Sequence, residues 1–145
     1  MDQNMEFVNY VYETSSMGAS SITTLLDTIK DKDNKIKKVC EDILKGHEAF
    51  IKKSKRILKK NNAEIKPVPM TAKLGSWMGI KTEMIKDNSD ARVADMVIRG
   101  LTMGIIELDK KIENFDKTIT NSNKKLAKEL RKFENESISL LKSYL

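Results

Sequence analysis

The apolar residues between Ser89 and Phe115 recur at steps of four and three, and this spacing restricts the fold more than any other feature of the chain. The line consists of Val93, Val97, Leu101, Gly104, Leu108, Ile112 and Phe115. Such steps place side chains along one face of an α-helix. A helix with one apolar face must bury that face against other helices. The stretch therefore predicts a helical bundle.

Three further segments carry apolar lines with the same spacing, so we expect one all-α domain spanning residues 1–145. The expected helices cover residues 4–30, 34–60, 89–117 and 123–144. The chain has only 2 prolines and 6 glycines, which favours helices over strands. Short turns would make two antiparallel hairpins, and a long crossover, residues 61–88, would connect them. We expect a short helix from Met70 to Trp77 within this crossover.

A weak internal repeat supports the two hairpins. A shift of 86 residues superposes Met17-Gly18 on Met103-Gly104, and Glu48 on Glu134. Helices one and two would therefore form one unit, and helices three and four would form a second unit of similar design.

A polar layer is expected halfway along the bundle. His47 lies on the apolar face of the second helix, level with the small residue Gly18, and Glu134 lies on the apolar face of the fourth. Buried polar groups are costly without partners, so we expect His47 and Glu134 to be hydrogen-bonded and to fix helix register. The layer comprises His47, Glu134, Glu107, Thr14, Ser15 and Ser21.

Two phrases, EDILKGHEAF and ADMVIRGLTMGIIEL, resemble segments of ferritin-like four-helix bundles. The layout is similar to that of small bundle proteins of spore-forming Gram-positive bacteria with spore-coat-F-type ferritin-like domains. The resemblance implies a ferritin-like bundle of two hairpins with a crossover, and descent from a metal-binding scaffold.

The chain lacks the residues of a di-iron site. Such a site takes a Glu from each of two helices and a Glu-x-x-His from each of the other two, whereas this chain has 1 histidine. The candidate ligands for a single metal ion are His47, Glu134 and Glu107. No other cofactor motif is present, and no nucleophile elbow surrounds a serine, so we expect no catalytic residues and no cofactor.

The charge balance favours anionic partners only weakly. The chain has 27 basic and 21 acidic residues, a formal charge of +6. The densest basic patch is Lys52, Lys53, Lys55, Arg56, Lys59 and Lys60. Cations near a helix C-terminus stabilise the helix dipole, so this patch does not by itself indicate nucleic-acid binding. We expect a cytoplasmic protein with no membrane span, because no 18-residue apolar run occurs and Cys40 has no partner cysteine.

These observations favour a non-enzymatic structural or interaction protein on a ferritin-like scaffold with a degenerate di-metal site. Its protein partner is not identified by the sequence. One alternative is a mononuclear metal or redox protein that uses His47, Glu134 and Glu107. The other alternative is a polyanion-binding module acting through the basic patch. We also expect a homodimer, because Trp77, Met78 and Ile80 need more apolar cover than one chain offers.

Overall fold

The computed structural model describes residues 2–68 and 87–145, and these residues are helical with no strand. The helices are α1 (Gln3–Thr28), α2 (Lys37–Lys60), α4 (Asp90–Phe115) and α5 (Asn121–Leu141), followed by the short 3-10 helix η1 (Lys142–Tyr144). The predicted all-α bundle is confirmed for this part of the chain. The predicted short helix at 70–77 lies outside the described residues, as do Trp77, Met78 and Ile80.

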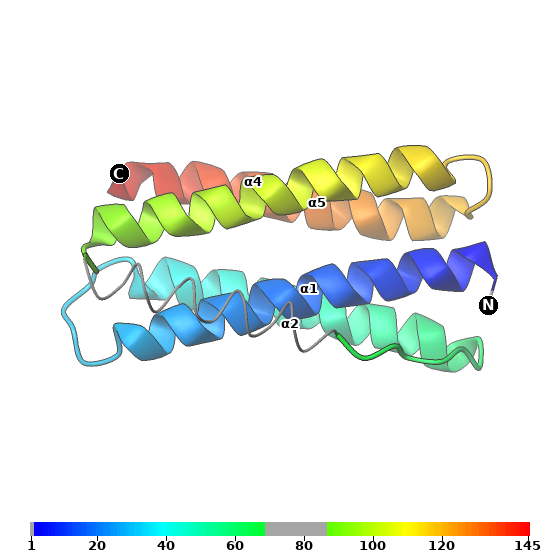
Figure 1. The fold of residues 1–145 in the computed structure, drawn as a ribbon, viewed down its shortest axis with the longest axis horizontal. Coiled ribbons are helices and arrows are strands. Elements are labelled where there is room, and N and C mark those ends of the chain that lie inside the picture. Colours follow the sequence, from blue (N-terminus) through cyan, green and yellow to red (C-terminus); the bar gives the residue numbers. More distant parts are fainter. Residues whose placement is uncertain (1, 69–86) are drawn as a thin grey trace.

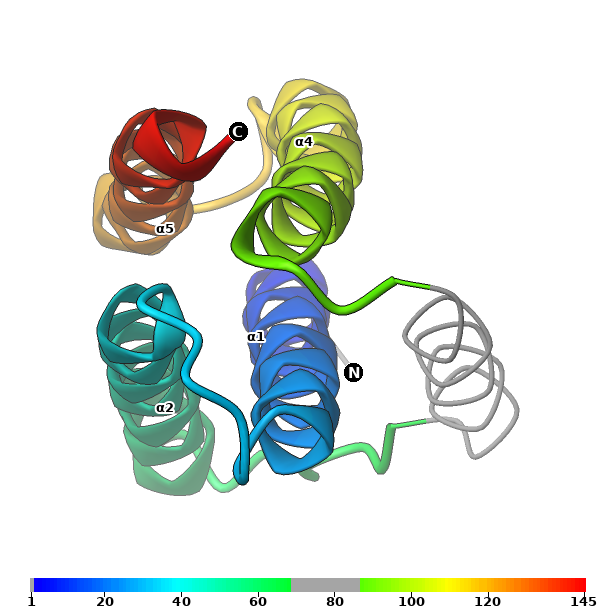
Figure 2. The same cartoon turned by 90° about the vertical axis from the view of Figure 1, so that its left-hand side faces the viewer.

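The four helices form two antiparallel hairpins, α1 with α2 and α4 with α5 (Figure 1). Viewed from the end, the helices occupy the corners of a square, with α4 above α1 and α5 above α2 (Figure 2). Helices α1 and α4 run in opposite directions (Figure 1). Packing is most extensive within each hairpin and sparser between the hairpins, where α1 contacts α4 and α2 contacts α5.

Side chains cap three helices at their first residues. The Asp2, Ser89 and Thr120 side chains accept hydrogen bonds from the backbone N–H groups of Met5, Arg92 and Asn123. A side-chain acceptor at this position satisfies a backbone donor that has no partner within the helix, so the caps fix where α1, α4 and α5 begin.

Helix α2 begins at Lys37, three residues later than the sequence predicts. The Asp90 carboxylate accepts hydrogen bonds from the backbone N–H groups of Lys35 and Ile36, and the Asn34 side chain donates to the carbonyl of Asn88. Residues 34–36 are therefore held by the start of α4 instead of forming the first turn of α2. This contact is tertiary, and apolar periodicity does not predict it.

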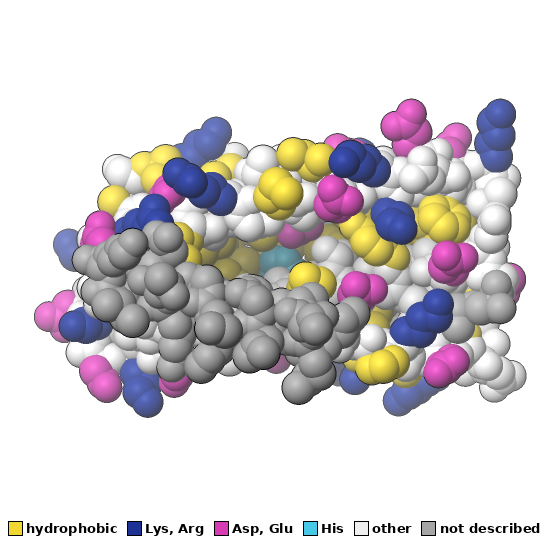
Figure 3. Space-filling model, viewed as in Figure 1, with side chains coloured by type: hydrophobic (Ala, Val, Ile, Leu, Met, Phe, Trp, Pro, Cys, Tyr) yellow, Lys and Arg dark blue, Asp and Glu magenta, His cyan; other side chains and the backbone are white. Residues whose placement is uncertain are grey.

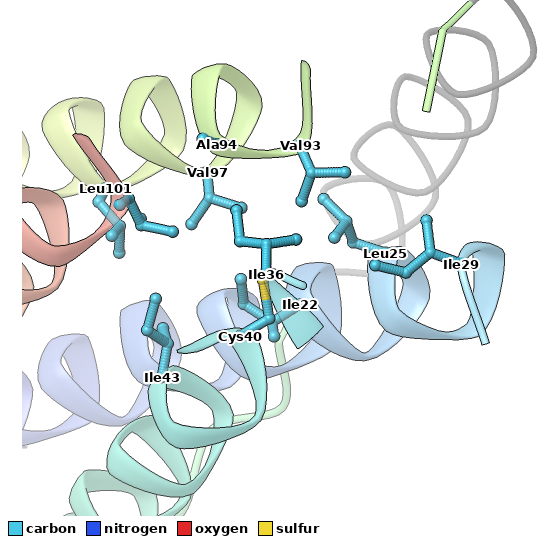
Figure 4. Close-up of a cluster of buried hydrophobic side chains, with 11 residues drawn as sticks. Ile22, Leu25, Ile29, Ile36, Cys40, Ile43, Val93, Ala94, Val97 and Leu101 are labelled. Carbon is cyan, nitrogen blue, oxygen red and sulfur yellow. The ribbon is translucent and has the colours of Figure 1, made fainter. Parts of the chain in front are cut away.

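The apolar core lies where the hairpins meet. One cluster joins α1, α2 and α4 near the turn of the first hairpin (Figure 4), and it comprises Ile22, Leu25, Ile29, Ile36, Cys40, Ile43, Val93, Ala94, Val97, Leu101 and Leu141. A second cluster, around Phe7 and Leu108, fills the opposite end. Burial raises the pKa of the Cys40 thiol to about 12, with smaller contributions from Asp90 and Glu41. This thiol is therefore an unreactive core residue.

Residues 61–68 follow α2 and are tied to α1 by Asn9. The buried Asn9 amide donates to the carbonyl of Glu64 and accepts from the backbone N–H of Lys66, at 3.0 and 2.9 Å. This pair of bonds fixes the path of the chain after the first hairpin. None of the described helices is both long enough and apolar enough to cross a membrane.

Candidate functional site

A cavity of about 490 Å³ lies between α1 and α4, halfway along the bundle. Figure 3 shows the hollow on this face, with the side chain of the chain's single histidine visible inside it. His47 and Glu134 reach the cavity from α2 and α5, and the side walls come from α1 and α4. All four helices therefore contribute to one site.

The two walls are related by the internal repeat. The wall residues of each helix are spaced at steps of four, three and four. On α1 they are Tyr10, Thr14, Met17 and Ser21, and on α4 they are Met96, Gly100, Met103 and Glu107. A shift of 86 residues converts the first set into the second. Because α1 and α4 are antiparallel, two similar stripes face each other across the cavity. The repeat was recognised from the sequence, but the two stripes of wall residues were not, because on each helix they lie beside the line of apolar residues that predicts the bundle.

His47 forms the inner surface of the cavity and is 1% exposed. Its Nδ1 lies 2.9 Å from the carbonyl oxygen of Ile43, and a carbonyl only accepts, so Nδ1 carries a proton. Its Nε2 lies 3.4 Å from Oε2 of Glu134. The Phe133 ring meets the imidazole edge-on, with centroids 5.5 Å apart. The imidazole is thus oriented by two helices.

Close packing places this pair opposite two glycines. A Cβ atom on Gly18 would lie 2.7 Å from Cδ2 of His47, so only glycine leaves room for the ring. A Cβ on Gly104 would lie 3.4 Å from Oε2 of Glu134. His47 therefore lies against Gly18, at the level that the sequence predicts, and Glu134 lies against Gly104. Each hairpin presents a glycine to the polar group of the cavity.

Glu134 is 5% exposed, and among residues 2–68 and 87–145 its Oε1 has no hydrogen-bond partner. Two bare acceptors 3.4 Å apart would repel, so Nε2 and Oε2 share one proton. The pair is then either imidazolium and carboxylate, or imidazole and carboxylic acid with the proton on Oε2. In both forms Oε1 is an acceptor without a donor. An unsatisfied buried acceptor costs about 1–3 kcal/mol, so it requires an explanation.

The structure separates the other residues of the expected polar layer. Thr14 and Ser21 are partly buried and line the cavity. Ser15 is fully buried outside the cavity lining, and its hydroxyl has no partner. The Glu107 side chain is 53% exposed and pairs with Lys110 at 3.4 Å, so it lies at the cavity edge and not in a buried layer.

Tyr10 and Glu13 also lie at the cavity, and the sequence analysis did not single out either one. Burial raises the pKa of the Tyr10 phenol to about 12, helped by the negative charges of Glu107, Glu13 and Glu134. The Lys111 ammonium lies over the Tyr10 ring, 5.1 Å from its centroid. The phenol is therefore half-buried beside three carboxyl groups at the edge of the cavity.

His47 and Glu134 are the only two of the three candidate metal ligands that meet. Among residues 2–68 and 87–145, no three His, Cys, Asp or Glu side chains are grouped so that they could hold a metal ion. Glu107 pairs with Lys110 instead. A metal ion at the cavity would therefore have two protein ligands in this arrangement, fewer than the three or four of typical zinc sites.

The basic patch lies far along α2, and all six of its side chains are exposed. The Lys53 ammonium lies over the Phe50 ring and the Lys55 ammonium over the Tyr12 ring, 5.1 and 5.7 Å from the centroids. Lys59 and Lys60 lie in the last turn of α2, where cations stabilise the helix dipole. This patch contributes no residue to the cavity.

Comparisons with protein-family models, with curated proteins and with solved structures found no match. The functional interpretation therefore rests on the geometry of the cavity.

Proposed function

We propose that this protein is a non-enzymatic binding protein whose cavity between α1 and α4 holds a small molecule. The observation that carries the proposal is the cavity itself, about 490 Å³ in a bundle of four helices. Protein interiors are packed to the density of organic crystals, whereas ligand sites measure roughly 300–1,000 Å³. A hollow of this size, open on one face of the bundle, lies within that range (Figure 3).

The lining has the composition of a ligand site. Most of its surface is apolar, from Met17, Ile22, Leu25, Met96, Val97, Leu101 and Met103, and a few polar groups converge at His47 and Glu134. Methionine side chains adapt to ligands of different shape. An apolar wall with a small polar end selects a molecule that is largely apolar and has one polar group.

The polar end is an anchor, not an activated nucleophile. The hydrogen-bond partners of His47 are the Ile43 carbonyl and the Glu134 carboxyl group. Within the described residues, no serine, threonine or cysteine donates to the imidazole, so the nucleophile and base of covalent catalysis are not paired here. This arrangement supports binding without reaction.

The ferritin-like scaffold belongs to the same proposal. Two observations support a ferritin-like scaffold. The two antiparallel hairpins are connected by a long segment, and a polar pair lies halfway along the bundle, where ferritin-like proteins hold a di-metal site. We propose that His47 and Glu134 now serve ligand binding on this scaffold.

Gly100 offers a direct test of the cavity. A Cβ at this position meets nothing within 4 Å; because Gly100 lines the cavity, we expect the side chain of Gly100→Leu to occupy part of it, and Gly100→Ala is the matched control. Isothermal titration calorimetry with para-butylbenzyl alcohol should show saturable one-to-one binding to the native protein and to Gly100→Ala. Gly100→Leu should weaken it at least about tenfold, equivalent to about 1.4 kcal/mol.

Circular dichroism would verify that Gly100→Leu keeps its helical content. Equal affinity in the native and Gly100→Leu proteins would contradict the proposal. So would the absence of saturable binding to the native protein up to about millimolar probe.

A further inference from the structure

Three carboxyl side chains line the cavity, although the chain as a whole is basic. The chain carries a formal +6 from 27 basic and 21 acidic residues. Within the described part of the chain, the cavity lining includes Glu13, Glu107 and Glu134 and no lysine or arginine. These carboxylates add to the burial that raises the pKa of Tyr10. The Glu13 and Glu107 carboxylates therefore favour a cationic ligand over an anionic one.

Glu134 provides a specific contact for a cation. Its Oε1 is buried in the cavity lining and accepts no hydrogen bond, while Oε2 faces His47 at 3.4 Å, longer than a typical hydrogen bond. Without a ligand the pair is neutral overall, because His47 and Glu134 share one proton; an ammonium group on Oε1 can replace the charge of that proton, leaving Glu134 a carboxylate beside a neutral imidazole. A ligand that donates to Oε1 would also supply the donor that this oxygen lacks, and charge-assisted hydrogen bonds are about twice as strong as neutral ones.

The surroundings favour an ammonium group over a metal ion. A protonated amine has three donors and no acceptor, which is complementary to the Glu134 carboxylate and the Thr14 hydroxyl, both of which line the cavity. A divalent ion would need more protein ligands than His47 and Glu134 supply. The apolar walls next to this polar end would contact the hydrocarbon part of the same ligand.

From these observations we propose that the ligand is an amphipathic amine, bound with its ammonium group on Oε1 of Glu134 and its apolar part between α1 and α4. This inference rests on the proposed function and adds the chemical class of the ligand. It also explains why an acidic side chain is buried at this place with one oxygen left unpaired.

Three probes of nearly equal shape isolate the charge: para-butylbenzylamine, para-butylbenzyl alcohol and para-butylbenzoate. Calorimetry at neutral pH should show the amine binding at least about tenfold more tightly than the alcohol, and the benzoate most weakly. Glu134→Gln keeps the side-chain shape and removes the charge, so it should reduce the amine's affinity to that of the alcohol. The matched control is Glu136→Gln, on the same helix but exposed, which should change none of the three affinities.

The outcomes separate this inference from the proposed function. If the amine and the alcohol bind equally well, or if the amine keeps its advantage in Glu134→Gln, the inference is overturned while the proposed cavity function stands. If none of the three probes binds the native protein, the proposed function itself fails. Undiminished binding of the alcohol to Glu134→Gln would show that this variant is folded, so that a loss of amine affinity reports the lost charge.

Discussion

Glycine has different roles at two positions that line the cavity. At Gly18 the neighbouring helix approaches so closely that a Cβ would lie 2.7 Å from the His47 ring, whereas at Gly100 a Cβ would meet open space. Both residues lie inside helices, where glycine is less favourable than alanine. Gly18 is thus required by packing, and Gly100 keeps the cavity open.

The Gly18→Ala and Gly100→Ala variants should therefore change stability in opposite directions. Gly100→Ala should stabilise the protein by roughly 0.5–1 kcal/mol, the usual gain in helix propensity. Gly18→Ala should destabilise it by roughly 1–3 kcal/mol, because the ring and the backbone must shift to relieve the overlap. Urea unfolding of both variants measures the difference, and equal effects would show that His47 does not occupy the space beside Gly18.

The raised pKa of Tyr10 predicts a distinct alkaline titration. Subtracting the phenolate absorbance of Tyr10→Phe from that of the native protein isolates the titration of Tyr10. Its midpoint should lie near pH 12, above the ordinary tyrosine pKa of about 10. Between these values the unfolded chain releases the Tyr10 proton and the folded chain keeps it. Stability should therefore fall as pH rises through this window, and less steeply in Tyr10→Phe.

Glu107→Gln removes a negative charge next to the phenol, so the pKa of Tyr10 should fall in this variant. Glu136→Gln, exposed on α5, should leave it unchanged. A Tyr10 midpoint near 10 in the native protein would show that neither burial nor the nearby carboxylates perturb the phenol.

At the scale of elements, the contact between His47 and Glu134 connects the two hairpins. His47 belongs to α2 and Glu134 to α5, and the two side chains are 1% and 7% exposed. Replacing one of the two residues with leucine leaves the other as a buried polar group that has lost a partner. Replacing both leaves no polar side chain of this pair in the core. The two residues should therefore be energetically coupled.

A double-mutant cycle with His47→Leu and Glu134→Leu measures this coupling. We expect a coupling free energy of about 1–3 kcal/mol, with the double variant more stable than the sum of the single changes predicts. Urea unfolding of the four proteins provides the values. Effects that add to within about 0.5 kcal/mol would mean that the two residues do not form a pair.

The elements also show what the sequence could and could not predict. Apolar spacing located the four helices, and the placement of His47 and Glu134 on those faces predicted their meeting, because register follows from hairpin geometry. The start of α2 was missed because Asp90, far away in sequence, holds residues 35 and 36. The cavity was missed because its volume depends on the separation of α1 and α4, which no periodicity determines.

At the scale of the whole molecule, the cavity lies where the two halves of the internal repeat face each other. Helices α1 and α4 pack less extensively on each other than each packs on its hairpin partner. The small residues Gly18, Gly100 and Gly104 leave space along this contact, and the rest of the bundle is closed by two apolar clusters. This space is the proposed ligand site.

Amide chemical shifts of the isotopically labelled protein, recorded during titration with para-butylbenzylamine, test this claim most directly. We expect saturable changes in amide chemical shift on the cavity-facing turns of α1 and α4, around Met17 and Gly104, and near Glu134 on α5. Residues on the exposed end of α2, around Lys59, should not shift. Saturable shifts confined to the basic patch, or no saturable shifts at all, would contradict the proposal.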